Sequence, residues 1–233
     1  EKIPGSPIAY WVSDRVKEIF NDGVLLKSIS EPKQGMATSD NNRFLKFWHE
    51  VDFVNIGFNF LNTKDAYDSN LKWFPYNKGG EFRKWYGNQE YVVNWKNDGQ
   101  EIKKFREYKN ATLSSNMGVA GLSDIFKESI TWSFVSSSNF GVRYSPNGFL
   151  FDVGGSSIFP DKKDIKYLTS FLCSNVTLVF LRIFSPTINF QAGDLKLLPI
   201  IFSQSDSNSI KQSIEILTQE NIDISKEEWD SRE

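Results

Sequence analysis

The residues best suited to ligand chemistry are concentrated in one segment, residues 71–105. Three of the seven tryptophans lie there (Trp73, Trp85 and Trp95), among further aromatic and basic side chains. Glycines let a backbone approach a ligand closely, because no side chain stands in the way. Flat rings beside fixed positive charge suit a polyanion that carries stackable bases. The candidate nucleic-acid contacts of this segment are Lys78, Gly79, Gly80, Arg83, Lys84 and Trp85.

The same segment also fits a purely structural interpretation. It has the pattern of an aromatic-rich β-hairpin, in which the rings form the core and the lysines are solvated. The composition favours neither interpretation. Trp85 and Tyr86 are candidates to brace an opened duplex, although core packing is the expected role of at least one of them.

A second candidate is the loop over residues 31–42, which holds few apolar side chains. Asparagine can read an adenine edge through two hydrogen bonds, and threonine or serine can contact bases or phosphates. The alternative is a surface loop of turn-forming residues. The candidate contacts are Thr38, Ser39, Asn41 and Asn42, with Arg43 at the base of the loop.

Arg143 is a further candidate for a phosphate or base contact. It lies in the second of three short strands that the alternation over residues 130–153 predicts. We expect it to be an exposed charge on its strand. A solvated arginine at a sheet edge is the alternative.

Catalytic machinery is not indicated by the sequence. A Ser-His-Asp triad or a histidine metal site would have to use His49, the single histidine, and its aromatic surroundings favour a packed structural role. Cys173 is the single cysteine, so no internal disulfide or cysteine zinc site is expected. We predict no catalytic and no metal-binding residues in this chain.

A cofactor site is not predicted either. The strand, Asp152 and Gly154-Gly155 superficially match the first cofactor motif of methyltransferases. That motif needs a helix that begins at the glycines. Residues 158–160 are Ile-Phe-Pro, which favours extended backbone instead. The catalytic run of adenine methyltransferases, Asn/Asp-Pro-Pro-aromatic, is also absent.

The charge distribution indicates where a polyanion would bind. The net charge of the 233 residues is −2, so the chain as a whole is not a basic nucleic-acid binder. The middle of the chain is basic and residues 207–233 are acidic. No signal peptide or long apolar run is present, which favours a cytoplasmic protein without a membrane partner. Both ends read as boundaries within a longer polypeptide.

Both helices and strands are expected to position these candidates. We predict a helix at 15–20, a strand at 24–29, an aromatic-basic hairpin followed by a helix, and the three strands above. Two helices broken near residues 174–175 follow, the second apolar nearly all round and therefore buried. A strand and closing loop, a linker at 203–209, an amphipathic helix and a last helix capped by Ser225 and Glu228 complete the chain. The expected fold is mixed α/β, with a curved, mostly antiparallel sheet and a helical C-terminal tail.

Several stretches resemble the PglX family, the large adenine-specific DNA methyltransferases of BREX phage-defence systems. The residues that carry the resemblance are FPYNKGGEFRKWYGNQEYVVNWKNDGQEIKKF, QGMATSDNNRFLKFWHEV, IPGSPIAYW, ITWSFVSS, DVGGSSIFP and ISKEEWDSRE. GDLKLLPI, at 193–200, resembles the end of specificity domains in adenine methyltransferases and type I restriction subunits.

The resemblance implies a target-recognition fragment of a larger enzyme. Its expected parts are a lead-in at 1–22, a recognition domain at 23–202 and a helical tail at 203–233. The fragment would bind double-stranded DNA without doing chemistry. S-adenosylmethionine and the flipped adenine would be held by the catalytic domain of the same polypeptide, and other BREX proteins are possible partners. The alternatives are a carbohydrate-binding domain and a protein-interaction domain.

Overall fold

The computed structural model describes residues 12–109, 122–136, 139–184, 187–201 and 207–232. In this part of the chain the fold is mixed α/β, as predicted, and the strands form three sheets. One sheet has the order β2-β4-β3-β7, with only β3 and β7 parallel; another has the antiparallel order β6-β5-β8; and β1 pairs with β9. The bounds are β1 (Val24–Leu25), β2 (Leu45–Phe47), β3 (Trp73–Asn77), β4 (Tyr91–Asn94), β5 (Ser129–Trp132), β6 (Val142–Ser145), β7 (Leu150–Phe151), β8 (Ser157–Ile158) and β9 (Pro199–Ile200).

The predicted mostly antiparallel pairing is therefore confirmed, but the prediction of one curved sheet is wrong. The aromatic-basic hairpin exists as β3 and β4, which pair through Trp73↔Asn94 to Tyr76↔Tyr91. Its tip is not a tight turn, because residues 78–90 form a long loop between the two strands.

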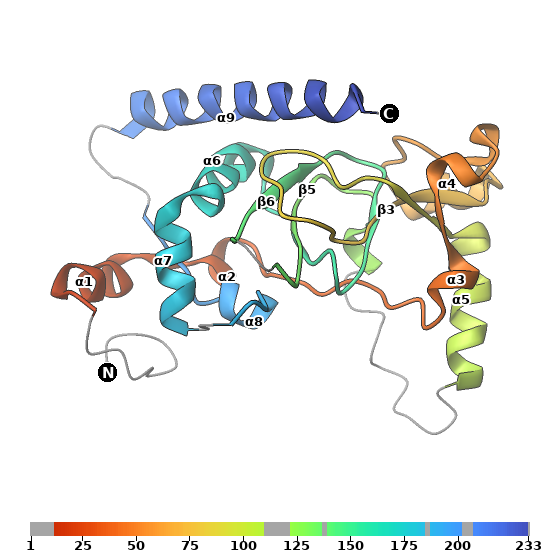
Figure 1. The fold of residues 1–233 in the computed structure, drawn as a ribbon, viewed down its shortest axis with the longest axis horizontal. Coiled ribbons are helices and arrows are strands. Elements are labelled where there is room, and N and C mark those ends of the chain that lie inside the picture. Colours follow the sequence, from red (N-terminus) through yellow and green to blue (C-terminus); the bar gives the residue numbers. More distant parts are fainter. Residues whose placement is uncertain (1–11, 110–121, 137–138, 185–186, 202–206, 233) are drawn as a thin grey trace.

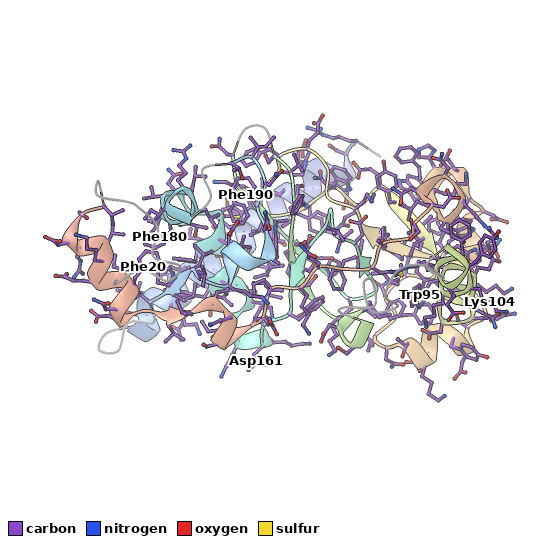
Figure 2. All side chains as sticks on the ribbon, turned by 90° about the horizontal axis from the view of Figure 1, so that it is seen from below. Phe20, Trp95, Lys104, Asp161, Phe180 and Phe190 are labelled. Carbon is purple, nitrogen blue, oxygen red and sulfur yellow. The ribbon has the colours of Figure 1, made fainter. Side chains whose placement is uncertain are left out.

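A first hydrophobic core lies at one end of the molecule, around the sheet β6-β5-β8. Aromatic rings link its layers: Phe20 lies 5.3 Å from Phe180, and Phe140 lies 4.9 Å from Phe190, between ring centroids. Figure 2 shows Phe20, Phe180 and Phe190 together at this end. The helices at this core are α1 (Asp14–Asp22), α2 (Leu26–Ile29), α6 (Lys162–Cys173), α7 (Asn175–Phe184) and α8 (Ala192–Leu195).

A second core lies at the other end, against the four-stranded sheet, where Figure 2 labels Trp95. Phe74 and Phe126 meet edge to face at 5.7 Å, and both are fully buried. Short helical segments surround this core: α3 (Asn41–Phe44), α4 (Thr63–Asp68), α5 (Lys96–Lys109) and the 3₁₀ turns η1 (Trp48–Glu50), η2 (Phe53–Asn55) and η3 (Leu122–Asp124). α5 is kinked near its start, because residues 97–99 all have positive φ.

The helix α9 (Ser207–Asp230) runs along the molecule from the first core towards the second (Figure 1). Lys211 bonds to Asp164 of α6 at 3.0 Å, and Trp229 near the other end is buried with Tyr86. The prediction of two helices separated at Ser225 is wrong. No glycine or proline interrupts residues 207–230, and Glu228 bonds to Arg83 instead of capping a helix.

Three further local predictions need correction. The strand predicted at 24–29 is only two residues long, since α2 begins at Leu26. α6 and α7 do break at Ser174, as predicted, but α7 is not buried all round: Val176 and Val179 are each about half exposed. His49 is exposed rather than packed in the core, although its ring stacks on Phe47 at 5.5 Å. The stretches 3–11 and 110–121 lie outside the described residues.

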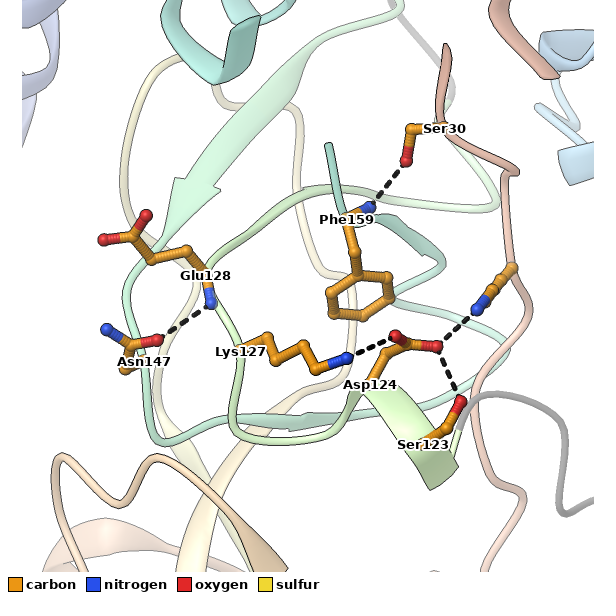
Figure 3. A network of polar contacts seen from close by, with 8 residues as sticks. Ser30, Ser123, Asp124, Lys127, Glu128, Asn147 and Phe159 are labelled. Carbon is orange, nitrogen blue, oxygen red and sulfur yellow. Dashed lines mark hydrogen bonds and ion pairs between the residues drawn. The ribbon is translucent and has the colours of Figure 1, made fainter. Parts of the chain in front are cut away.

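Asp124 joins the segment before α3 to the second core. Its carboxylate accepts hydrogen bonds from Lys127 and Ser123, both at 2.9 Å, and from Lys33, 91 residues earlier in the chain. Figure 3 shows this network beside the bond from the Phe159 amide to the Ser30 hydroxyl. Burial opposes ionisation of Asp124, but the bonds from Lys33, Lys127 and Ser123 outweigh it, so the pKa of Asp124 is lowered from 3.8.

This lowered pKa predicts a loss of stability in acid. A carboxyl with a depressed folded-state pKa stabilises the fold above its ordinary pKa, and the contribution disappears as pH falls through the folded value. The free energy of unfolding in urea, measured between about pH 2 and pH 6, should therefore decrease less steeply for Asp124→Asn than for the wild type. Asp161→Asn, at an exposed position, is the control and should keep the wild-type slope. Equal slopes for all three proteins would contradict the prediction.

No helix among the described residues combines the length and the apolarity needed to cross a membrane.

Candidate nucleic-acid interface

A recess of about 490 Å3 brings together candidates from two distant parts of the chain. Asn41 and Asn42 of α3 line it together with Lys78, which follows β3. We call this site the polar recess, and its lining residues are Asn41, Asn42, Leu45, Lys46, Phe47, Glu50, Lys78 and Tyr91.

Local hydrogen bonds fix the asparagine side of the recess. The Asp40 carboxylate caps α3 by accepting from the Arg43 amide at 3.2 Å. The buried Thr38 hydroxyl donates to Oδ1 of Asn41 at 2.6 Å, and Ser39 makes the preceding turn with φ 63°. Thr38 therefore positions Asn41 and is too buried to reach a ligand, whereas Asn41 and Asn42 are exposed.

Stacked rings form another wall of the recess. β2 pairs with β4 so that Phe47 lies opposite Tyr91, and their rings stack at 4.8 Å. Burial, and then the carboxylates of Glu90 and Glu50, raise the pKa of Tyr91, so its phenol stays protonated and able to donate a hydrogen bond.

Two cations near the recess have no carboxylate partner in the part of the chain that the structure describes. Lys46 lines the recess, and the exposed Arg43 holds its guanidinium 5.0 and 5.2 Å from the ring centroids of Phe44 and Phe105. Such ring contacts hold a guanidinium in place while leaving its donors available. Lys46, Phe47 and Tyr91 were not among the candidates predicted from the sequence. The alternation of side chains along β2 could have indicated that Lys46 is accessible. The sequence did not show that β2, β4 and residue 78 come together in space.

Lys78, Arg83 and Lys84, the three cations predicted to contact nucleic acid, are each bound within the protein. Lys78 is paired with Asp152, Arg83 bonds to Glu228 of α9 at 2.6 Å, and Lys84 donates to the carbonyl of Cys173 at the end of α6 at 2.6 Å. The three cations thus bind three different elements of the protein itself, and only Lys78 lines the polar recess.

Trp85, Gly79 and Gly80 lie against other parts of the protein chain. Trp85 is half-buried, with its backbone bonded to Val142 and Tyr144 at 2.8 Å and its ring packed against the first core. Tyr86 is buried, which confirms that at least one of these two rings packs in a core. Gly79 is buried, and a Cβ there would lie 2.3 Å from the Gly154 carbonyl oxygen, whereas Gly80 is exposed.

The expectation that Arg143 is exposed is wrong. Its side chain is only 2% exposed, and its guanidinium donates to the Ser133 hydroxyl at 3.3 Å. Its side of β6 faces a buried layer that also holds Thr131 and Ser145, so no solvent reaches it. Burial lowers the pKa of Arg143 to about 10.

The glycine pair at residues 154–155 does not open a helix, which the first cofactor motif of methyltransferases would need. Gly154 and Gly155 lead into the strand β8, as predicted from Ile158-Phe159-Pro160, and the next helix begins only at Lys162. A Cβ at Gly155 would lie 2.2 Å from the Asn77 carbonyl oxygen, so this glycine serves the crossing of two loops. Within the described ranges, no three His, Cys, Asp or Glu side chains come together as a metal site.

Comparison with known proteins shows which proteins the chain resembles. No family model matches the chain. Two curated relatives are adenine-specific methyltransferases, and each matches this chain along its whole length, so the chain is similar to one segment of those proteins. The relatives are PglX of Lacticaseibacillus casei (strain Zhang), 43% identical over 237 residues, and BrxX of Escherichia coli O9:H4 (strain HS), 36% identical over 239 residues. The predicted resemblance to PglX is thereby confirmed. The chain spans only 19% and 17% of the lengths of these two relatives.

Proposed function

We propose that this chain is the DNA target-recognition part of an S-adenosylmethionine-dependent N6-adenine methyltransferase of the BREX type. The mixed α/β fold is then a methyltransferase recognition fold, with its sheets holding the contact residues. Methyl transfer would occur on a catalytic domain of the same polypeptide, which would hold both the cofactor and the target adenine. A cytoplasmic location and contacts with other BREX proteins belong to the same proposal.

The observation that carries the proposal is the composition of the polar recess. Exposed amides at Asn41 and Asn42 are the groups that read base edges, and ammonium groups at Lys46 and Lys78 are the groups that hold phosphates. These residues come from segments more than 30 residues apart and meet because β2, β4 and β3 are neighbours in one sheet. The two relatives are named adenine-specific methyltransferases, and adenine is a base of nucleic acids, which supports a nucleic-acid partner for the recess.

The contacts divide into two roles in this proposal. Arg43 and Lys46 supply phosphate contacts, which give affinity and register, and Lys78 does so once its pairing with Asp152 is relieved. Asn41 and Asn42 supply edge contacts, which give sequence choice. The alternatives lack a comparable constellation: a sugar-binding site would not need the unpaired cations around the recess.

The test is the salt dependence of binding to a short random-sequence duplex, measured by fluorescence anisotropy. Binding by the wild-type chain should weaken linearly in a double-logarithmic plot as salt rises. Each of Arg43→Ala and Lys46→Ala should reduce the slope of that plot by about 1. Lys163→Ala, which removes an exposed lysine on α6 that does not line the recess, is the matched control and should not change the slope.

Substitutions of the asparagines should behave differently from those of the cations. Asn41→Ala and Asn42→Ala should leave the salt slope unchanged and reduce discrimination among duplex sequences, by about 1–3 kcal/mol for a lost bidentate contact. Selection from a random duplex pool measures this discrimination. The proposal fails if the wild type shows no salt-dependent binding, or if Lys163→Ala lowers binding as much as Lys46→Ala.

A further inference from the structure

A second hollow, of about 440 Å3, lies beside the polar recess and is lined mainly by aromatic rings. It is formed by the segment from η1 to residue 59, the start of β4 and the C-terminal end of α9, which points towards the second core in Figure 1. Tyr91 lines both this hollow and the polar recess, so the two sites share a wall. We call it the aromatic hollow, and its principal rings are Trp48, Phe53, Phe58, Tyr86, Tyr91 and Trp229.

The outer rings of the hollow are unusually accessible for their type. Phe53 is 63% exposed and Phe58 is 42% exposed, and their centroids lie 5.3 Å apart. The inner rings are fixed from behind: the Arg83 guanidinium lies 4.8 Å from the Trp229 ring, and Lys226 lies 5.6 Å from the Tyr86 ring. A hollow with a fixed floor and an accessible aromatic rim can accept a flat ligand.

The polar groups of the hollow favour a ligand with a hydrogen-bonding edge. Asn59 and Gln89 both line it, and neither side-chain amide has a hydrogen-bond partner among the described residues. Each amide offers a donor and an acceptor. The carboxylate of Asp230 also lines the hollow but is already paired with Lys226. An uncharged planar ring with donors and acceptors at its edge satisfies these groups, and a nucleobase is such a ring.

We propose that the aromatic hollow takes one unpaired nucleobase from DNA whose backbone is held at the polar recess. This inference rests on the proposed function. Bases stack on aromatic side chains whatever their sequence, and the shared wall at Tyr91 places the hollow next to the phosphate contacts. The site would bind a base that has left the duplex stack, so the protein would prefer a distorted duplex over a fully paired one.

The experiment compares three probes of equal length: a fully paired duplex, the same duplex with one single-nucleotide bulge, and the single strand. Quenching of tryptophan fluorescence includes a contribution from the hollow, because two of the seven tryptophans, Trp48 and Trp229, line it. The bulged duplex should bind about 5- to 100-fold more tightly than the paired duplex, the range expected from stacking one base. A 2-aminopurine placed at the bulge should lose fluorescence on binding.

Two variants locate the effect. Phe53→Ala/Phe58→Ala removes the exposed rim and should abolish the preference for the bulged duplex. Val54→Ala is the matched control, since Val54 is 73% exposed in the same segment but does not line the hollow, and it should keep the preference.

Each outcome distinguishes a failure of the base-binding inference from a failure of the proposed DNA-recognition function. If the paired duplex binds with a salt dependence but the bulge gives no advantage, this inference falls and the proposed function stands. If only the unpaired strand binds and Phe53→Ala/Phe58→Ala abolishes that binding, the inference stands and duplex recognition falls. If no probe quenches the tryptophans, or if Val54→Ala acts like the double variant, the inference is overturned, and a protein surface or a sugar becomes the better occupant.

Discussion

Gly79→Ala is expected to lower the free energy of unfolding by more than about 3 kcal/mol. Gly79 has φ 91°, a conformation that a residue with a Cβ adopts only with strain, and the new methyl group would lie 2.3 Å from the carbonyl oxygen of Gly154. That neighbour is backbone, so it cannot move aside by changing a rotamer. Urea denaturation at neutral pH measures the loss, which should occur without a change in the denaturant slope.

Gly193→Ala is the matched control for this substitution. Gly193 lies in α8, and no atom lies within 4 Å of the position where a Cβ would be built. Alanine favours helices by up to about 1 kcal/mol over glycine, so this variant should be neutral or slightly more stable. If Gly79→Ala were as stable as Gly193→Ala, residues 79 and 154 would not cross closely, and the glycine could still serve the approach of a ligand.

The role of Gly79 shows how far local sequence patterns could be interpreted. The Gly79-Gly80 pair indicated that something approaches the backbone closely, and this is correct. The neighbour at Gly79 is another glycine loop of the same chain, 75 residues later, and not a ligand. A glycine pattern indicates a close approach, but it does not indicate which molecule approaches.

Some elements that depend on short-range patterns were predicted correctly. β3 and β4 follow from the aromatic residues and valines of the hairpin segment, and the break between α6 and α7 follows from the polar pair Ser174-Asn175. The family resemblance could also be recognised from the sequence, because it depends on runs of residues and not on their positions in space.

The positions of the charged residues were predicted poorly, since their partners are distant in the sequence. Glu228 lies 145 residues after Arg83, and the carbonyl of Cys173 lies 89 residues after Lys84. Arg143 was assigned to a strand correctly, but alternation only separates two faces of a strand. It does not show that both faces of β6 are covered, one by the first core and the other by a layer of buried hydroxyls.

Lys78→Met should lower the free energy of unfolding by about 2–4 kcal/mol, because it leaves the carboxylate of Asp152 buried without its cation. Asp152 is almost fully buried, and Oδ1 accepts from the Gly155 amide at 2.9 Å while Oδ2 pairs with Lys78. Burial raises the pKa of Asp152 in spite of Lys78, which shows how strongly its surroundings oppose the charge. Lys78→Met/Asp152→Asn removes both charges and should recover most of the lost stability; a double variant no more stable than Lys78→Met would contradict this account.

The same pair decides whether Lys78 contacts DNA, because the double variant separates binding from folding. Asp152→Asn keeps the acceptor for the Gly155 amide and releases the ammonium of Lys78 at the edge of the polar recess. If Lys78 holds a phosphate, Asp152→Asn should bind the random-sequence duplex more tightly than the wild type and increase the salt slope by about 1. Lys78→Met/Asp152→Asn should lose this gain, although it is folded. Equal slopes for these two variants would confine Lys78 to its structural pairing and leave phosphate binding at the recess to Arg43 and Lys46.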